Sequence, residues 1–430
     1  MIHISRRTDI SRTKILLIKL VAIALSLVVC ALITTLATGQ NPLAVFASLV
    51  SGSFGSKRKF WIFLQNTSIL LCISLAVTPA FKMRCWNLGA EGQVLAGALA
   101  TAACMILLAD KMPSGLLFVV MVLAAILAGA VWAAIPAFFK AKWNTNETLF
   151  TLMMNYVAIQ IVAYYVKIWE NPKGSNNVGV INQNSQLGWM PQLVNKQLLI
   201  VLIVFVLTVF MFVYLKYSKH GYEIAVVGES ERTARYIGIN VSKVIVRTML
   251  LSGAICGIAG FLLVSGINHT IASSIAGGQG FTAVMVSWLS KFNPFIMIAS
   301  SGLLMFMDAG AGDISTNFGL NRSFGDILTG IIIFFIIGVE FFINYDVEFR
   351  KKEKEVEIRI AFCSATYLMT SGRRWIRCLV MALTNTTGAY WQNTSSLRIS
   401  SWKRSVESFC FSYKSHLLTT RITPLPASCA

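Results

Sequence analysis

Residues 87–93 read "NLGAEGQ" and place one carboxylate, two amides and two glycines at the edge of a long apolar segment. Apolar residues dominate on both sides, before residue 82 and after residue 93. In a hydrocarbon environment every polar group without a partner raises the free energy of the folded chain. The stretch is therefore either the start of a membrane helix or a break in one.

The composition indicates whether the chain lies in water or in a membrane. The 430 residues are 56% hydrophobic and only 13% charged, with a mean hydropathy of +0.67, whereas soluble domains carry about 25% charged residues. The sequence predicts a polytopic membrane protein. The net charge of +19 is spread over short loops, which argues against a nucleic-acid partner. The nine cysteines follow no metal-binding spacing, and disulfides are not implied.

The apolar segments predict an all-α bundle of about ten spans, because a bilayer core of about 30 Å needs about 20 apolar residues. The spans are expected near 16–36, 60–81, 87–109, 115–138, 147–168, 197–215, 245–267, 280–290, 294–312 and 326–344. The span 280–290 is too short to cross alone, so we expect a half-helix beside irregular backbone.

The distribution of Lys and Arg predicts an N-terminus on the cytoplasmic side, because these residues are more numerous in the loops of that side. Residues 1–15 are then a cytoplasmic N-terminus, and residues 16–345 form the transmembrane domain. A polar loop from about 169 to 196 faces outward. A second long loop, from about 216 to 244, faces the cytoplasm.

With this orientation, residues 87–93 begin a helix that runs from the cytoplasmic side of the membrane to the outer side. Asn87 is suited to be its N-cap, and Glu91 falls in the first turn, where the helix dipole favours a negative charge. A stripe of small residues follows at every fourth position: Gly92, Ala96, Ala100 and Cys104. An N-cap at Asn87 does not account for the polar residue Gln93. A helix break beside a transport path would account for it.

The same stretch, extended to "NLGAEGQVLAGALA", resembles a signature of ABC importer permeases for nucleosides and simple sugars, in the superfamily of the branched-chain amino acid and ribose permeases. Four more segments resemble this family in the same order: "NETLFTLMMNYVA" at 146–158, "GYEIAVVGESERTARYIGINVSKV" at 221–244, "SGAICGIAGFLLVSG" at 252–266 and "GFTAVMVSWLSKFNP" at 280–294. The similarity runs from about residue 40 to 345.

Polar residues inside the predicted spans are candidates for the translocation path. They are Asn87, Glu91, Gln93, Asn66, Asn155 and Asp308. Hydrogen bonding between helices is an equally common use of such residues. Glycines at small-residue positions are interpreted as packing contacts between helices: Gly89, Gly92, Gly253 and Gly257.

The predicted cytoplasmic loop combines apolar and charged residues, so an exposed short helix there needs a partner. The resemblance implies that it docks on an ATP-binding subunit, and the alternative is a plain solvated loop. The coupling candidates are Gly221, Glu229, Arg232, Arg235 and Gly238.

The chain shows no ATP site of its own. The segment "GSFGSK" at 52–57 has the wrong spacing for a phosphate-binding loop. The four histidines offer no metal cluster, and no enzyme motif is found. We therefore expect no catalytic residue, metal or cofactor in this chain.

The resemblance implies the partners and the cargo. ATP and Mg²⁺ would bind to separate ATPase subunits, a second permease (identical or paralogous) would complete the path, and an extracytoplasmic binding protein or lipoprotein would deliver the solute. A nucleoside is the first expectation and a simple sugar the second. The competing class is a stand-alone secondary transporter or channel in the cell membrane, which would need ion-coupling carboxylates and no docking loop.

The C-terminal part, residues 346–430, breaks the pattern. After Glu357 it is basic and rich in Ser and Thr, without a helical or strand period. We expect residues 358–430 to be an out-of-frame extension, or else a disordered basic tail on anionic lipid.

Overall fold

The computed structural model describes residues 2–6, 12–39, 41–192, 195–319 and 345–349, with isolated positions between 324 and 341. The chain divides into two compact units: Arg7–Asn344, and Met1–Arg6 together with Tyr345–Ala430. In the second unit strand β1 (Ile2–Arg6) pairs antiparallel with β2 (Tyr345–Phe349), with Ile2 opposite Phe349. The predictions for residues 350–430 lie outside the described residues.

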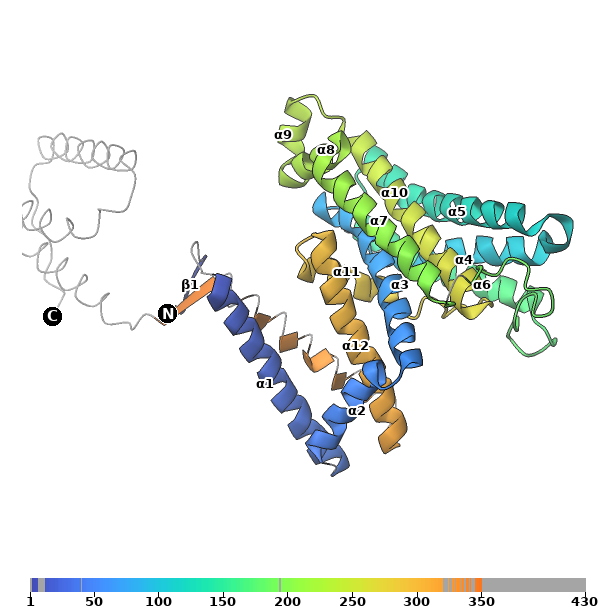
Figure 1. Ribbon diagram of the computed structural model, residues 1–430. Coiled ribbons are helices and arrows are strands. Elements are labelled where there is room, and N and C mark those ends of the chain that lie inside the picture. Colours follow the sequence, from blue (N-terminus) through green and yellow to red (C-terminus); the bar gives the residue numbers. More distant parts are fainter. Residues whose placement is uncertain are drawn as a thin grey trace, which may run out of the picture. The chain divides into compact units, whose positions relative to one another are not determined.

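The larger unit is helical (Figure 1). Its elements are α1 (Arg12–Thr38), α2 (Pro42–Phe54), α3 (Lys57–Lys82), α4 (Ala90–Leu107), the short 3-10 helix η1 (Ala109–Lys111), α5 (Ser114–Trp143), α6 (Glu147–Trp169), α7 (Leu198–Tyr217), α8 (Lys219–Glu229), α9 (Glu231–Tyr236), α10 (Val241–Phe261), its π-helical continuation η2 (Leu262–Asn268), α11 (Gln279–Leu289) and α12 (Pro294–Phe318).

The predicted membrane bundle is confirmed. Within the described residues, seven helices are long and apolar enough to cross a membrane: α3, α4, α5, α6, α7, α10 with η2, and α12. The short span expected at 280–290 is α11. The expected span 16–36 falls within α1, and most of 326–344 lies outside the described residues. Helix α2 was not predicted, because its 13 residues are too few to span a bilayer.

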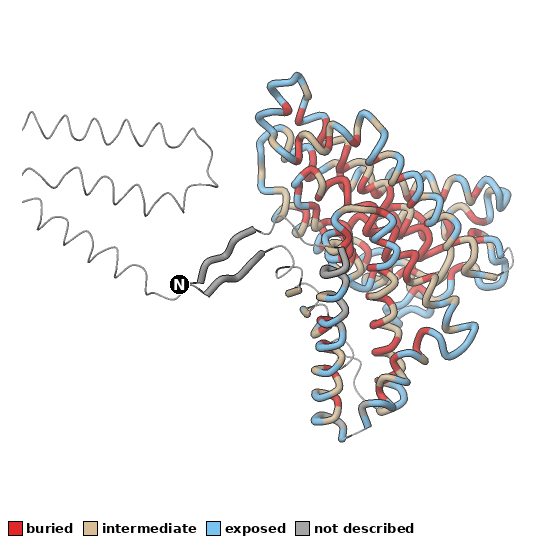
Figure 2. Tube along the Cα trace, turned by 60° about the vertical axis from the view of Figure 1, so that its left-hand side comes forward, coloured by how far each residue is buried: buried red, intermediate tan, exposed pale blue. Residues whose placement is uncertain are grey.

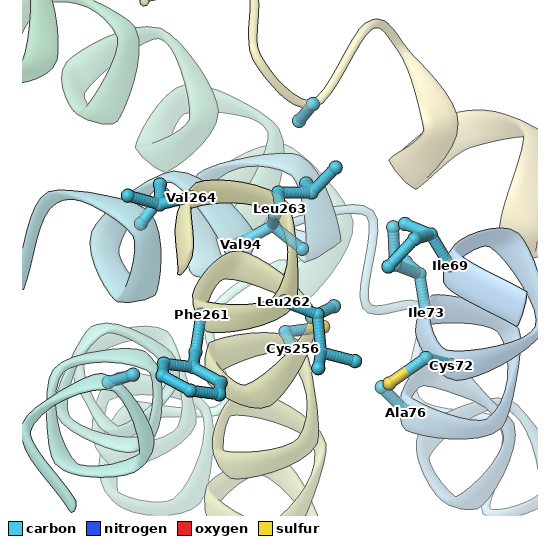
Figure 3. Packing of buried hydrophobic residues seen from close by; sticks show 14 of the residues in the cluster. Ile69, Cys72, Ile73, Ala76, Val94, Cys256, Phe261, Leu262, Leu263 and Val264 are labelled. Atoms are coloured by element: carbon cyan, nitrogen blue, oxygen red, sulfur yellow. The ribbon is translucent and has the colours of Figure 1, made fainter. Parts of the chain in front are cut away.

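The core is formed where α3, α4 and α10 meet. Every residue of α3 from Thr67 to Phe81 is buried, as expected for a helix surrounded by others. Figure 3 shows Ile69 and Ile73 of α3, Val94 of α4 and the α10 end packed together, and Figure 2 shows that buried residues concentrate in the middle of the bundle.

The outer helices expose apolar side chains instead. On α5, Leu123, Leu127 and Val131 are each more than half exposed, at four-residue intervals. Such a stripe on a membrane helix faces lipid. The bundle therefore has a protein-facing centre and a lipid-facing rim.

Helix α10 approaches α4 and α5 at backbone distance. A methyl group on Gly257 would clash with the carbonyl oxygen of Ala125, and one on Gly253 would clash with the carbonyl oxygen of Gly129. A methyl group on Gly97 would lie 2.6 Å from the Cα atom of Gly257. Small residues permit this close packing in membranes. Gly97 and Gly129 are partners that the sequence did not single out.

Seven helices begin at a capping Ser or Asn whose side chain accepts a backbone N–H of the first turn: α2, α3, α6, α8, α9, α10 and α12. Helices α4 and α11 instead follow Gly89 and Gly278, which have no side chain to serve as a cap. Their unpaired N–H groups need partners from elsewhere in the bundle.

Candidate functional site

Helix α11 begins inside the bundle. Its Ser287 hydroxyl lies 3.1 Å from that of Thr78 on α3, and its Trp288 packs against Phe81, further along α3. Gly280 lies seven residues before Ser287, which is about 10 Å of helix. The start of α11 is therefore level with the middle of α3, about halfway through the bundle.

Helix α4 begins at the same level. The segment 85–89 is not helical and leads from Trp86, stacked 5.5 Å from Trp288, to the helix start at Ala90. The expectation that Asn87 caps this helix was wrong, because the N-cap position is Gly89. The Asn87 Oδ1 atom instead accepts the N–H of Gly89 at 3.0 Å, before the helix begins.

Glu91 caps α11 rather than its own helix. Its side chain is buried, and its two carboxylate oxygens accept the backbone N–H groups of Gly278 at 2.9 Å and Gly280 at 2.8 Å. The negative charge thus lies at the positive end of the α11 dipole. A methyl group on Gly280 would come within 2.6 Å of the Glu91 nitrogen, so the contact requires glycine.

Asn155 on α6 serves α4 in the same way. Its Oδ1 atom accepts the Gly92 N–H at 2.9 Å, and its Nδ2 atom donates to the Leu88 carbonyl at 2.8 Å. The Thr151 hydroxyl, one turn earlier, accepts the Leu88 N–H at 3.2 Å. Helix α6 therefore caps α4, and α4 caps α11.

The two amides of the opening stretch bind each other. The Gln93 Nε2 atom donates to Asn87 Oδ1 at 3.2 Å, and Asn87 Nδ2 donates to the Ser252 hydroxyl of α10 at 3.0 Å. Both amides are almost fully buried. We call this assembly the Glu91 junction: Asn87, Glu91, Gln93, Asn155, Ser252 and the backbone of Gly278 and Gly280.

Two other predicted path residues lie on helices outside the junction. Asn66 is 16 residues before the end of α3, or about 24 Å of helix. Asp308 lies on α12, which packs mainly against α2 and α3. Sequence reasoning missed Asp313, five residues further on, whose carboxylate pairs with the Lys59 ammonium at 2.6 Å. Lys59 and Asp313 are far apart in the sequence, so no local spacing of residues could predict that they pair.

Gln279, the first residue of α11, was also missed. Its Oε1 atom is buried, and no group in the described part of the chain donates a hydrogen bond to it. An unpaired buried acceptor is costly unless something else satisfies it. It adjoins the backbone N–H groups that Glu91 binds. The feature of the sequence that could have indicated Gln279 is its position directly before the segment 280–294, which resembles the permease family.

The coupling candidates lie at one end of the bundle, on or beside α8 and α9 (Figure 1). Glu229, Arg232 and Arg235 are exposed, and Gly238 has a left-handed backbone with φ of +86°. Gly221 packs on the end of α7, where a methyl group would lie 2.5 Å from the carbonyl oxygen of Tyr214. We call this the coupling-loop end of the bundle.

An ion pair fixes α8 to α10. The Arg247 guanidinium donates to the Glu223 carboxylate at 2.6 Å, and this hydrogen bond lowers the pKa of Glu223 below its ordinary value. Tyr236, at the end of α9, is 92% exposed. The first helix of the loop is therefore anchored, and the second presents its side chains outward.

Comparison with known proteins agrees with this architecture. A family model described as "Branched-chain amino acid transport system / permease component" matches residues 60–337. No group of three His, Cys, Asp or Glu residues within the described ranges could hold a metal ion.

Three relatives are similar over most of their length. The guanosine ABC transporter permease of Bacillus subtilis is 28% identical over 76% of this chain and 94% of its own. The nucleoside ABC transporter permease NupB of Lactococcus lactis is 26% identical over 78% and 93%. The glucose ABC transporter permease of Haloferax volcanii is 29% identical over 65% and 76%. The chain is a multi-pass protein of the cell membrane, and it belongs to the family of ABC transporter permease components typified by the branched-chain amino acid transport systems.

Proposed function

We propose that this chain is the permease of an ABC importer that takes up nucleosides. The observation that carries the proposal is the similarity to the guanosine permease, which extends over 94% of that protein. The alternative cargo is a simple sugar, favoured by the similarity to the glucose permease. The chain itself binds no cofactor, and ATP with Mg²⁺ is hydrolysed in separate ATPase subunits.

The translocation path passes the Glu91 junction. Transporters place broken helices at the middle of the membrane, where helix ends and irregular backbone can meet a solute. Here α4 and α11 both begin at that level and are joined by Glu91. Gln279 offers an amide whose oxygen is free to accept a hydrogen bond from a base or sugar. Asn66 and Asp308 are further path candidates, nearer the opposite end from the coupling loop.

The coupling-loop end faces the cytoplasm, and α8 and α9 dock on the ATPase. Supporting this assignment, Arg232 and Arg235 project from α9 without packing in the chain's own core. A second permease completes the path, and a binding protein or lipoprotein delivers the solute from outside. ATPase closure then rocks the two permeases between outward-facing and inward-facing states.

The test is uptake of radiolabelled guanosine by cells that lack their own nucleoside uptake and express the chain with its ATPase and binding protein. We expect ATP-dependent uptake that unlabelled nucleosides inhibit and glucose does not. Uptake of radiolabelled glucose, with none of guanosine, would favour the sugar alternative. Uptake that persists without the ATPase would overturn the proposal in favour of a secondary transporter.

A matched pair of variants tests the solute contact. Gln279→Leu removes the unpaired amide, and loss of one hydrogen bond of about 0.5–1.5 kcal/mol should lower the apparent affinity roughly twofold to tenfold. Gln160→Leu removes an exposed amide from α6 and should leave uptake unchanged. Equal uptake by both variants, at matched expression, would remove Gln279 from the path.

A further inference from the structure

A concave site lies at the coupling-loop end. It is a pocket of about 490 Å³ between the end of α3, the end of α11 and helix α8. The side chains that give it chemical character are Lys82, Arg84, Glu229, Trp86, Trp288 and Phe292. Pockets for small ligands measure about 300–1,000 Å³, so its size fits one small molecule.

The cations of this pocket are available to a ligand. The Arg84 side chain is exposed and forms no ion pair or hydrogen bond with any described residue, while its backbone N–H donates to the Phe81 carbonyl. Within the described ranges, the Lys82 ammonium donates a hydrogen bond only to the carbonyl oxygen of Leu215, at 3.4 Å. Glu229 is the one acid among the lining residues. Two cations against one carboxylate favour a small anion, and arginine suits a phosphate in particular.

The aromatic side chains supply flat faces beside these cations. Trp86 and Trp288 stack on each other at 5.5 Å, and Phe292 lies 5.6 Å from Trp288. Both tryptophans still expose almost half of their surface, 44% and 48%. Tryptophan alone is common at membrane interfaces. Aromatic faces that line a pocket together with two cations are instead suited to a ligand with a stacking base and a negative charge.

We propose that this pocket binds a small anion that carries an aromatic ring, with a nucleoside monophosphate as the chemical class. The phosphate would meet Arg84 and Lys82, the base would stack on Trp86 or Trp288, and Glu229 would accept from a sugar hydroxyl. The pocket is distinct from the Glu91 junction, because Trp288 lies eight residues beyond Gly280, about 12 Å along α11.

Equilibrium binding to the full chain tests the proposal. The chain is placed in nanodiscs of phosphatidylcholine and titrated calorimetrically with adenosine monophosphate, adenosine or inorganic phosphate. We expect the monophosphate to bind at least tenfold more tightly than either of the others. Arg84→Gln and Trp86→Leu should each weaken that binding about tenfold, and Arg58→Gln, which removes an exposed arginine elsewhere, should not change it.

The outcomes separate this site from its alternatives. Phosphate that binds as tightly as the monophosphate would overturn the proposal, as would wild-type binding by both Arg84→Gln and Trp86→Leu. Loss of binding in nanodiscs with one-third phosphatidylglycerol would assign the pocket to a lipid headgroup and overturn it too. Size-exclusion profiles matching the wild type show that the variants are folded. Because the readout needs no uptake, failure of the transport proposal would leave the result intact.

Discussion

Glu91 is the residue on which the two broken helices depend. A carboxylate has two oxygens that can each accept a backbone N–H, and here both are used, on Gly278 and Gly280. A glutamine in its place offers one oxygen and two unwanted donors. The charge at the α11 start would also be lost.

We therefore expect Glu91→Gln to lower the free energy of unfolding by about 1–3 kcal/mol, because one N–H group is left unpaired in the bundle. Uptake should fall as well, at matched expression. Glu170 is a matched control, since its carboxylate accepts the N–H groups of Gly174 and Asn176 in an exposed loop. Thermal unfolding of purified Glu91→Gln and Glu170→Gln makes the comparison, and equal midpoints would contradict the trans-capping role.

Gln93 shows where sequence reasoning stopped. Residues 87–93 identified the polar groups, but apart from the Asn87–Gln93 pair their partners lie on other helices, such as Ser252 on α10 for Asn87 and Asn155 on α6 for Gly92. Those pairings depend on how the bundle folds, so no spacing in the stretch could reveal them. The sequence predicted Asn87 as the cap of α4, because a cap of this kind lies next to its own helix in the sequence. The cap of α11 could not be found in that way, because Glu91 lies 187 positions away from Gly278.

The pairing changes what Gln93→Leu should do. With its amide bound to Asn87, the substitution should lower the free energy of unfolding by about 0.5–1.5 kcal/mol. The double variant with Asn87→Leu should cost less than the sum of the two single variants, because both remove the same hydrogen bond. Thermal unfolding of the four proteins measures this coupling, and strictly additive effects would be evidence against the pairing.

At the level of elements, the glycines of α10 determine how closely this helix packs on its neighbours. Gly257→Ala would push a methyl group into the carbonyl oxygen of Ala125, and backbone cannot move aside as a side chain can. We expect a loss of about 1–3 kcal/mol in stability. Gly302→Ala on α12 is the matched control, because its nearest neighbour would be the Thr67 methyl group at 3.9 Å. Helix propensity favours alanine there by about 1 kcal/mol. A Gly257→Ala protein as stable as Gly302→Ala would argue against the close contact.

Helix α8 is held by a titratable pair. The hydrogen bond from Arg247 lowers the pKa of Glu223 below 4.5. Stabilisation by such a carboxylate is present above the unfolded pKa and is lost as pH falls through the folded pKa. Protection of the α8 amides, which is how far the observed exchange rate lies below the intrinsic rate at the same pH, should therefore be high at neutral pH and fall when the pH drops below the ordinary range of a glutamate. Glu223→Gln should show low protection across this whole pH range, and a wild-type profile for this variant would refute the anchor.

The elements themselves were largely predictable, because long apolar segments directly indicate membrane helices. Seven predicted spans match membrane-length helices, and the shortness of 280–290 correctly indicated a half-helix. Helix α2 escaped prediction because 13 residues fit no span. Its place is set by packing on α12, where Gly310 lies against Leu49, and such tertiary contacts leave no local period in the sequence.

At the scale of the whole molecule, α11 joins the two ends of the proposed mechanism. Its first turn is bound by Glu91, and its last turn carries Trp288, which stacks on Trp86 ahead of α4. Helix α8 packs on the end of α3, with Gly228 against the carbonyl oxygen of Lys82. We expect these contacts to pass a movement of the loop at 216–244 to the end of α3 and, through the aromatic stack, to the starts of both broken helices.

The last prediction concerns that coupling. Arg232→Glu with Arg235→Glu reverses two exposed charges on α9 and leaves its buried Ala234 in place. The exposed ion pair of Arg235 with Glu231 contributes little to stability, so the chain should remain folded and in the membrane. If α9 docks on the ATPase, solute-stimulated ATP hydrolysis and uptake should both fall at least tenfold. Reversal of Lys57 and Arg58, exposed at the far end of α3, should preserve both. Full coupling in the α9 variant would place the ATPase contact elsewhere on the chain.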